Sequence, residues 1–207
     1  MSRAITYFFS LVSPWAYIGH APFMDLVRRH RLRVDYRPVS LALVFAETGG
    51  LPLAKRHPAR QRHRMLELQR WREKRGLSFD LHPRHWPFDT KLPDQLVIAL
   101  AAAGHDPSEF LRLVFIACWE QNRDAADEGI LTELLTAAGF DAPPLVEVAK
   151  AEATAERYAQ NVKDAIAADA FGSPVYVLDG EAFWGQDRLE LLEDALLSGR
   201  QPFRTDA

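Results

Sequence analysis

Ser13 stands where an apolar run gives way to a helical pattern, in the stretch "FFSLVSPWAY" at residues 8–17. Serine followed by proline is a common helix opening, because the hydroxyl caps a free backbone N–H and proline is tolerated at the first helical position. A helix start also favours a bound anion, because its unpaired N–H groups and the helix dipole stabilise negative charge. The residue types at this joint therefore fit a helix cap or a binding site for an anion.

A disulfide-exchange enzyme would carry a Cys-x-x-Cys motif at such a helix start. Here the residues from Ser13 to Ala16 read Ser-Pro-Trp-Ala, so both cysteines are replaced. The only cysteine of the chain, Cys118, lies in "RLVFIACWEQ" and is predicted to be a small core residue. Redox exchange is therefore excluded at Ser13, whose hydroxyl can still donate a hydrogen bond to an anion.

A second candidate lies far along the chain, in "AFGSPVYVL" at residues 170–178. A cis bond before Pro174 would turn the backbone of Ser173 outward, so that its N–H and C=O could pair with an extended, peptide-like ligand. A proline that merely starts a strand explains the same pattern, and the residues alone leave both interpretations open.

Gln186 and Asp187 begin the last helical pattern, in "FWGQDRLELL". Asp187 is a natural N-cap for that helix. Alternatively, the free N–H groups and the Gln186 amide hold a ligand carboxylate while Asp187 holds an ammonium group. A carboxylate and an ammonium on one carbon form the end of an amino acid.

The elements that must position these residues follow from hydrophobic periodicity. Strands are predicted at 4–9 and 32–41 around a helix from about 15 to 30, which makes a βαβ unit. After a break at 48–52, helices are predicted at 58–75, 92–103, 107–121, 127–138 and 143–170, the last of them broken, with a loop at 81–89. The chain ends with a hairpin around Asp179-Gly180 and a helix at 186–197.

This order, β-α-β, a helical block and then β-β-α, predicts an α/β protein: a thioredoxin-like fold with an inserted all-helical domain. The thioredoxin-like domain would comprise residues 1–45 and 171–207, and the insertion residues 46–170. Composition agrees with a globular protein, since 48% of the 207 residues are hydrophobic and 26% are charged.

The bulk properties exclude several classes of protein. One cysteine cannot form an internal disulfide or a zinc site, which favours a reducing, cytoplasmic location. No apolar stretch approaches the roughly 20 residues that span a bilayer, so no membrane association is expected. The net charge of −3 and the absence of a recognition motif argue against nucleic-acid binding.

A basic stretch runs through residues 55–75, with nine Lys or Arg against two Glu. Its plain interpretation is a solvated helix face, although Lys55 or Arg56 could attract an anionic substrate. His82 and His85 lie three residues apart in a proline-rich stretch, and no metal site is predicted there.

Several stretches together resemble the 2-hydroxychromene-2-carboxylate isomerases, which belong to the DsbA-like superfamily close to kappa-class glutathione transferases. They are "FFSLVSPWAY", "QRW" at 69–71, "HWPFDT" at 85–90, "ATAERY" at 153–158 and "FGSPVYVLDGEAFWGQDRLELL" at 171–192. The resemblance covers nearly the whole chain and implies a glutathione-dependent isomerase of aromatic-compound degradation. It also implies a homodimer.

The resemblance implies roles for individual residues. Ser13 would contact the glutathione sulfur as the catalytic residue. Further glutathione contacts carry over to Ser173, Trp184, Gly185, Gln186 and Asp187, with Gln186 in place of the family's usual asparagine. The small aromatic carboxylate substrate would be bound by Phe45 and Lys55, in the loop after the second strand, and by His85 and Trp86 further along the chain. The loop after the second strand departs from the family pattern.

Two alternatives remain open. A kappa-like glutathione transferase would use the same thiolate but release a conjugate. A redox-inactive thioredoxin-fold module would present a groove to peptides and ignore glutathione.

Overall fold

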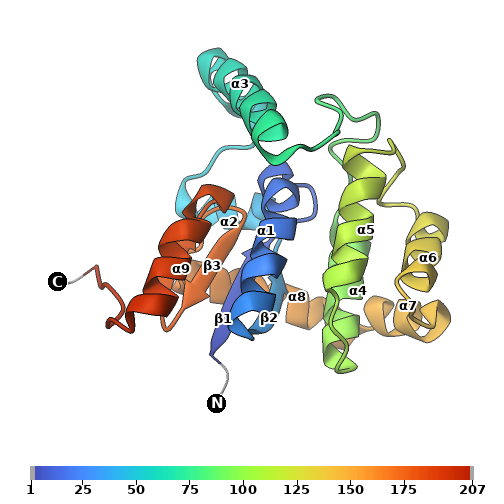
Figure 1. Cartoon of the computed structure of the whole chain (residues 1–207). Coiled ribbons are helices and arrows are strands. Elements are labelled where there is room, and N and C mark those ends of the chain that lie inside the picture. Colours follow the sequence, from blue (N-terminus) through green and yellow to red (C-terminus); the bar gives the residue numbers. More distant parts are fainter. Residues whose placement is uncertain (1–2, 206–207) are drawn as a thin grey trace.

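The computed structural model describes residues 3–205. Its centre is a four-stranded sheet in the order β2-β1-β3-β4 (Figure 1). β1 pairs parallel with β2 and antiparallel with β3, and β3 pairs antiparallel with β4. The strands are β1 (Ala4–Phe9), β2 (Arg33–Pro38), β3 (Val175–Leu178) and β4 (Glu181–Trp184). This mixed sheet confirms the predicted thioredoxin-like fold.

The sheet holds because its central strands are apolar on both faces. Tyr7 of β1 lies opposite Tyr176 of β3, and their rings stack with centroids 5.3 Å apart. Phe8 points to the other face, where it packs in a second apolar cluster with Val175. The predicted hairpin turn is confirmed at Asp179-Gly180, where both residues have positive φ as a two-residue turn requires.

Nine α-helices lie within the described residues, and most match the predicted ranges. They are α1 (Pro14–His30), α2 (Leu41–Thr48), α3 (Pro58–Arg75), α4 (Lys91–Ala102), α5 (Ser108–Trp119), α6 (Glu128–Ala137), α7 (Ala142–Lys150), α8 (Glu152–Ala167) and α9 (Leu189–Ser198). Two 3-10 turns accompany them, η1 (Leu53–Lys55) and η2 (Gln186–Arg188). The break predicted inside 143–170 falls at Ala151, which separates α7 from α8.

Two predicted boundaries were wrong. The second strand ends at Pro38 rather than at residue 41, and the residues after it form α2, which the sequence did not predict. Leu41 to Thr48 is apolar enough to read as a strand end, and only Ser40 and Gly49 mark it as a short helix. The last helix begins at Leu189 rather than at Gln186, because residues 186–188 form the tighter turn η2.

Helices cover both faces of the sheet. α1 and α9 lie on one face, and α2 and α8 lie on the other (Figure 1). On the second face, Val162 and Ala165 of α8 pack in the cluster that contains Phe8 and Val175. α8 therefore covers one face of the sheet although it falls within residues 46–170. The division of the chain into two domains stays a prediction.

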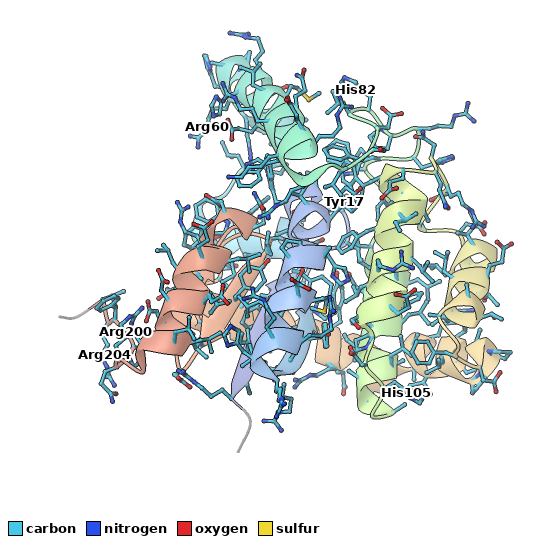
Figure 2. The ribbon with its side chains drawn as sticks, in the orientation of Figure 1. Tyr17, Arg60, His82, His105, Arg200 and Arg204 are labelled. Atoms are coloured by element: carbon cyan, nitrogen blue, oxygen red, sulfur yellow. The ribbon has the colours of Figure 1, made fainter. Side chains whose placement is uncertain are left out.

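α3 stands apart from the layers, beyond the N-terminal end of α1 (Figure 1). Leu68 is its one buried residue, and most of its basic side chains are exposed. Figure 2 shows Arg60 on this helix and His82 in the loop after it, both beyond Tyr17 of α1. Among the described helices, none is both long enough and apolar enough to cross a bilayer.

Candidate functional site

Ser13 caps α1 directly after the loop that leaves β1. Its Oγ accepts a hydrogen bond from the Ala16 backbone N–H at 3.3 Å, and Pro14 follows as the first helical residue. The same hydroxyl donates to the Ser173 carbonyl at 3.1 Å, and the Ser13 side chain is almost completely buried. The structure thus gives Ser13 its capping role and also joins it to the C-terminal segment.

Ser173 ties both ends of the loop that precedes α1. Its Oγ accepts a hydrogen bond from the Ser10 backbone N–H at 3.0 Å, while its carbonyl accepts from Ser13. The Ser173–Pro174 peptide bond is cis, which was one of the two forms left open by the sequence. The Ser173 carbonyl accepts the Ser13 hydrogen bond in this structure, and its pairing with a ligand stays a prediction.

Gln186 lies in η2 against the second turn of α1. It is only 2% exposed, and a Cβ added to Gly19 would lie 2.6 Å from the Gln186 Cβ. The Arg75 guanidinium, from the C-terminal end of α3, donates to Gln186 Oε1 at 3.2 Å. This contact fixes the amide oxygen and was not predicted, because it joins residues 111 positions apart.

Asp187 is not the N-cap of the last helix, which corrects the prediction. Arg188 takes that position, while Asp187 sits inside η2 and pairs with the Arg188 guanidinium. The exposed Asp187 carboxylate folds back on Gly185, since a Cβ added there would lie 2.4 Å from Asp187 Oδ1. Gly185 has a φ of +107°, and its N–H donates to the Pro174 carbonyl at 2.9 Å.

Trp184 covers the backbone just before Ser173. A Cβ added to Gly172 would lie 2.4 Å from Trp184 Nε1, so only glycine allows this close approach. The Trp184 ring also packs edge-on against Phe171, with centroids 4.6 Å apart. The side chain remains 53% exposed and is free to contact a ligand.

Trp86 is the predicted substrate-side residue that the structure places next to Ser13. Its indole N–H donates to the Val12 carbonyl at 2.8 Å. The Arg64 guanidinium of α3 lies over the Trp86 ring, 4.9 Å from its centroid. Trp86 is therefore fastened to the loop that carries Ser13, with a cation above it.

The other substrate-side residues make contacts away from Ser13. His85 Nδ1 lies 3.8 Å from Asp124 Oδ2, and Lys55 is exposed at the end of η1. Phe45 of α2 packs against Gly50. The Arg56 guanidinium lies over the Phe45 ring, with its Cζ 5.8 Å from the ring centroid. No described contact joins these three side chains to Ser13, and their substrate role stays a prediction.

A buried carboxyl group behind the loop was missed. Asp94, in the first turn of α4, is completely buried and accepts a hydrogen bond from Tyr158 Oη at 2.7 Å. The backbone N–H of Leu11 faces the same carboxyl, and burial raises the pKa of Asp94 to about 8. An aspartate in the otherwise apolar "LVIALAA" neighbourhood was the signal available in the sequence.

The structure places Cys118 in the core, as predicted. The thiol is buried, and burial raises its pKa to about 12, so the thiolate is disfavoured at neutral pH. The chain therefore supplies no reactive thiol of its own from Cys118.

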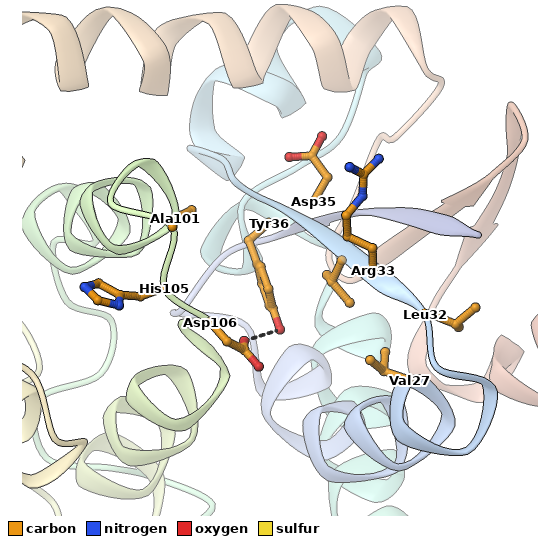
Figure 3. Close-up of a pocket in the computed structure, with 10 residues that line it drawn as sticks. Val27, Leu32, Arg33, Asp35, Tyr36, Ala101, His105 and Asp106 are labelled. Atoms are coloured by element: carbon orange, nitrogen blue, oxygen red, sulfur yellow. Dashed lines mark hydrogen bonds between the residues drawn. The ribbon is translucent and has the colours of Figure 1, made fainter. Parts of the chain in front are cut away.

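A cavity of about 620 Å³ lies between β2 and the turn joining α4 to α5 (Figure 3). Tyr36 Oη donates to Asp106 Oδ1 at 2.9 Å beside it, and Arg33 and His105 are among its lining residues. The cavity lies toward the start of β1, since Ala4 pairs with Arg33, whereas Ser13 follows the end of β1. None of the predicted site residues lines it.

The sequence profile of the DSBA-like thioredoxin domain matches residues 4–197. The chain belongs to this family. Among its relatives, a 2-hydroxychromene-2-carboxylate isomerase from Sphingobium xenophagum is 28% identical, over 95% of this chain and 100% of the relative. Glutathione S-transferase kappa 1 from Caenorhabditis elegans is 26% identical, over 96% and 92% of the two chains.

A solved structure of 2-hydroxychromene-2-carboxylate isomerase superposes with a TM-score of 0.75. It is 23% identical, over 93% of this chain and 94% of that chain. The resemblance drawn from the sequence motifs is thereby confirmed, and this family member shares its fold with an isomerase.

Proposed function

We propose that the protein is a glutathione-dependent isomerase that acts on a 2-hydroxychromene-2-carboxylate-type substrate in the degradation of aromatic compounds. The observation that carries the proposal is Ser13: a buried hydroxyl at a helix start, where the family's redox members would need a thiol. Similarity to the isomerases over 95% of the chain supports the choice of reaction.

The surroundings of Ser13 suit a bound thiolate. A cysteine-type thiol has a pKa near 8.5, so about 3% of it is ionised at pH 7. A hydrogen bond to a charged sulfur contributes about 1.5–3 kcal/mol, and the helix start about 0.3–1 kcal/mol. Together they lower the thiol pKa by about 1.5–3 units, which makes the thiolate the main form at neutral pH.

Binding a sulfur requires the Ser13 hydroxyl to change its acceptor. The proton that now points to the Ser173 carbonyl would turn to the sulfur, while the cap bond from Ala16 is kept. The Ser173 N–H would pair with the ligand backbone, as the edge of a strand does.

The amino-acid end of glutathione would be bound by residues around η2. Arg75 already holds Gln186 Oε1, which leaves the amide NH2 to donate to the ligand carboxylate. Asp187 would pair with the ammonium group, and the exposed Trp184 ring would cover the peptide. Glutathione bound by these residues would supply a sulfur nucleophile for the isomerisation and would not be consumed.

Mass analysis of the products tests the reaction type. The enzyme is incubated with glutathione and the chromene carboxylate, and an isomerase returns free glutathione together with a product of unchanged mass. A glutathione adduct would instead identify a kappa-like transferase, which the 26% identical relative makes the second candidate. Calorimetry showing no glutathione binding at millimolar concentration would favour a peptide-binding module.

A further inference from the structure

The guanidinium of Arg64, on the basic helix α3, is partly buried. Arg64 has no carboxylate within 4.0 Å among residues 3–205, whereas its neighbour Arg70 pairs with Glu67 on the same helix. The polar contact of Arg64 Nη1 is the Met65 sulfur at 3.7 Å, and Nη2 is buried without a hydrogen-bond partner. A buried donor without a partner is costly unless a ligand satisfies it.

Arg64 is linked to the loop that carries Ser13 through a single side chain. Its guanidinium lies over the Trp86 ring at 4.9 Å, and the Trp86 N–H donates to the Val12 carbonyl at 2.8 Å. Val12 directly precedes Ser13. A ligand held by Arg64 would therefore lie on the Trp86 side of the proposed sulfur position.

A second cation, Arg56, adds positive charge near Arg64. Burial, and to a lesser extent the positive charge of Arg56, lowers the pKa of Arg64 to about 10. Arg56 donates to the Leu51 carbonyl at 2.7 Å and lies over the Phe45 ring. An anion between α2, α3 and Trp86 would relieve the repulsion between the two guanidinium groups.

We infer that Arg64 is a specificity-determining residue that binds the carboxylate of a planar aromatic substrate. The Trp86 ring packs against the Arg64 guanidinium and holds it in place. The inference rests on the proposed function for the identity of the reaction, and it adds a residue to the four predicted substrate contacts. An arginine fork matches a carboxylate with two parallel hydrogen bonds, which a lysine cannot reproduce.

The variant Arg64→Met keeps the length and apolar stem while it removes the charge. With the chromene carboxylate, its KM is expected to rise about 10- to 100-fold, since charged hydrogen bonds of this kind account for such factors. The affinity for glutathione and the rate with the neutral electrophile 1-chloro-2,4-dinitrobenzene should not change. Arg70→Met, an exposed and paired position on the same helix, is the matched control.

A binding measurement keeps this inference separate from the proposed function. Salicylate and the neutral salicylamide are titrated against the intact protein while tryptophan fluorescence is followed. The wild type should prefer salicylate, Arg64→Met should lose that preference, and Arg64→Lys should keep part of it. Equal salicylate affinity in the wild type and in folded Arg64→Met, including no binding to either, overturns the inference whether or not the chain isomerises a chromene. A loss of glutathione affinity in Arg64→Met also overturns it.

Discussion

The Ser13 hydroxyl donates a hydrogen bond to the Ser173 carbonyl at 3.1 Å, across 160 positions of sequence. This contact joins the start of α1 to the segment that leads into β3. The hydroxyl is therefore oriented toward the Ser173 carbonyl, with its cap bond from Ala16 as the second restraint. A sulfur that takes the Ser13 hydrogen bond has to replace this carbonyl as the acceptor.

Removing the Ser13 hydroxyl should separate its two roles. Ser13→Ala is expected to lower the free energy of unfolding by about 1 kcal/mol through loss of the cap. It should lower kcat/KM with glutathione and the chromene carboxylate by about 10- to 100-fold through loss of a charged hydrogen bond. Ser13→Thr retains a hydroxyl and should keep most of the activity. Unchanged activity in Ser13→Ala would mean that Ser13 is only a cap.

Arg75 is expected to act through Gln186. Arg75→Met removes the donor that holds Gln186 Oε1, so the amide can rotate and the dissociation constant for glutathione should rise about 3- to 10-fold. Isothermal titration calorimetry measures this change. Lys74→Met is the control, because both Lys74 and Arg75 lie over the Trp71 ring but Lys74 is exposed. Equal affinities in both variants would remove Gln186 from the proposed glutathione site.

Trp86 and Trp184 should respond differently to replacement by phenylalanine. Trp86→Phe loses the hydrogen bond to the Val12 carbonyl and should lower the free energy of unfolding by about 0.5–1.5 kcal/mol. Trp184→Phe should change it by less than about 0.5 kcal/mol, because this half-exposed ring is held by packing alone. Urea denaturation gives both values. A Trp86→Phe protein as stable as the wild type would show that the ring does not anchor the loop.

Asp94 should make the protein less stable as the pH rises. Its pKa is raised by burial to about 8, while in the unfolded chain it lies near 4, so the folded state binds the extra proton between these values. The contribution of Asp94 to the free energy of unfolding is therefore largest below about pH 4 and decreases as the pH approaches 8.

Asp94→Asn mimics the protonated carboxyl and should flatten this decline, exceeding the wild type at pH 8 by about 1 kcal/mol or more. Denaturation midpoints at pH 5, 6, 7 and 8 measure the slope. Asp141→Asn, at an exposed helix start without a side-chain cap bond, should leave the slope as it is. A wild-type slope that Asp94→Asn does not alter would contradict the buried, protonated state.

The fold was predictable because its signals are local. The βαβ start, the Asp179-Gly180 turn and the final amphipathic helix each follow from a few adjacent residues. α2 was missed because Leu41 to Thr48 has the apolar character of a strand, and tertiary packing of Val44 against the sheet decides its form.

The candidate site was predictable where a residue sits at an element boundary. Ser13 and Ser173 could be named from their places before a helix and a strand, although their hydrogen bond could not. Arg64, Arg75 and Asp94 were missed because their importance depends on partners brought close by the fold: Trp86, Gln186 and Tyr158. In the sequence, the two arginines cannot be told from the other seven cations of residues 55–75.

The ionisation of bound glutathione tests the central claim most directly. The thiolate absorbs near ~240 nm, and its pH titration in the presence of the protein reports the pKa of the sulfur, which for a free cysteine-type thiol is near ~8.5. We predict a pKa below about 7 with the wild type and a return toward the free value with Ser13→Ala. A sulfur that titrates at the free value with saturating wild-type protein would contradict the account.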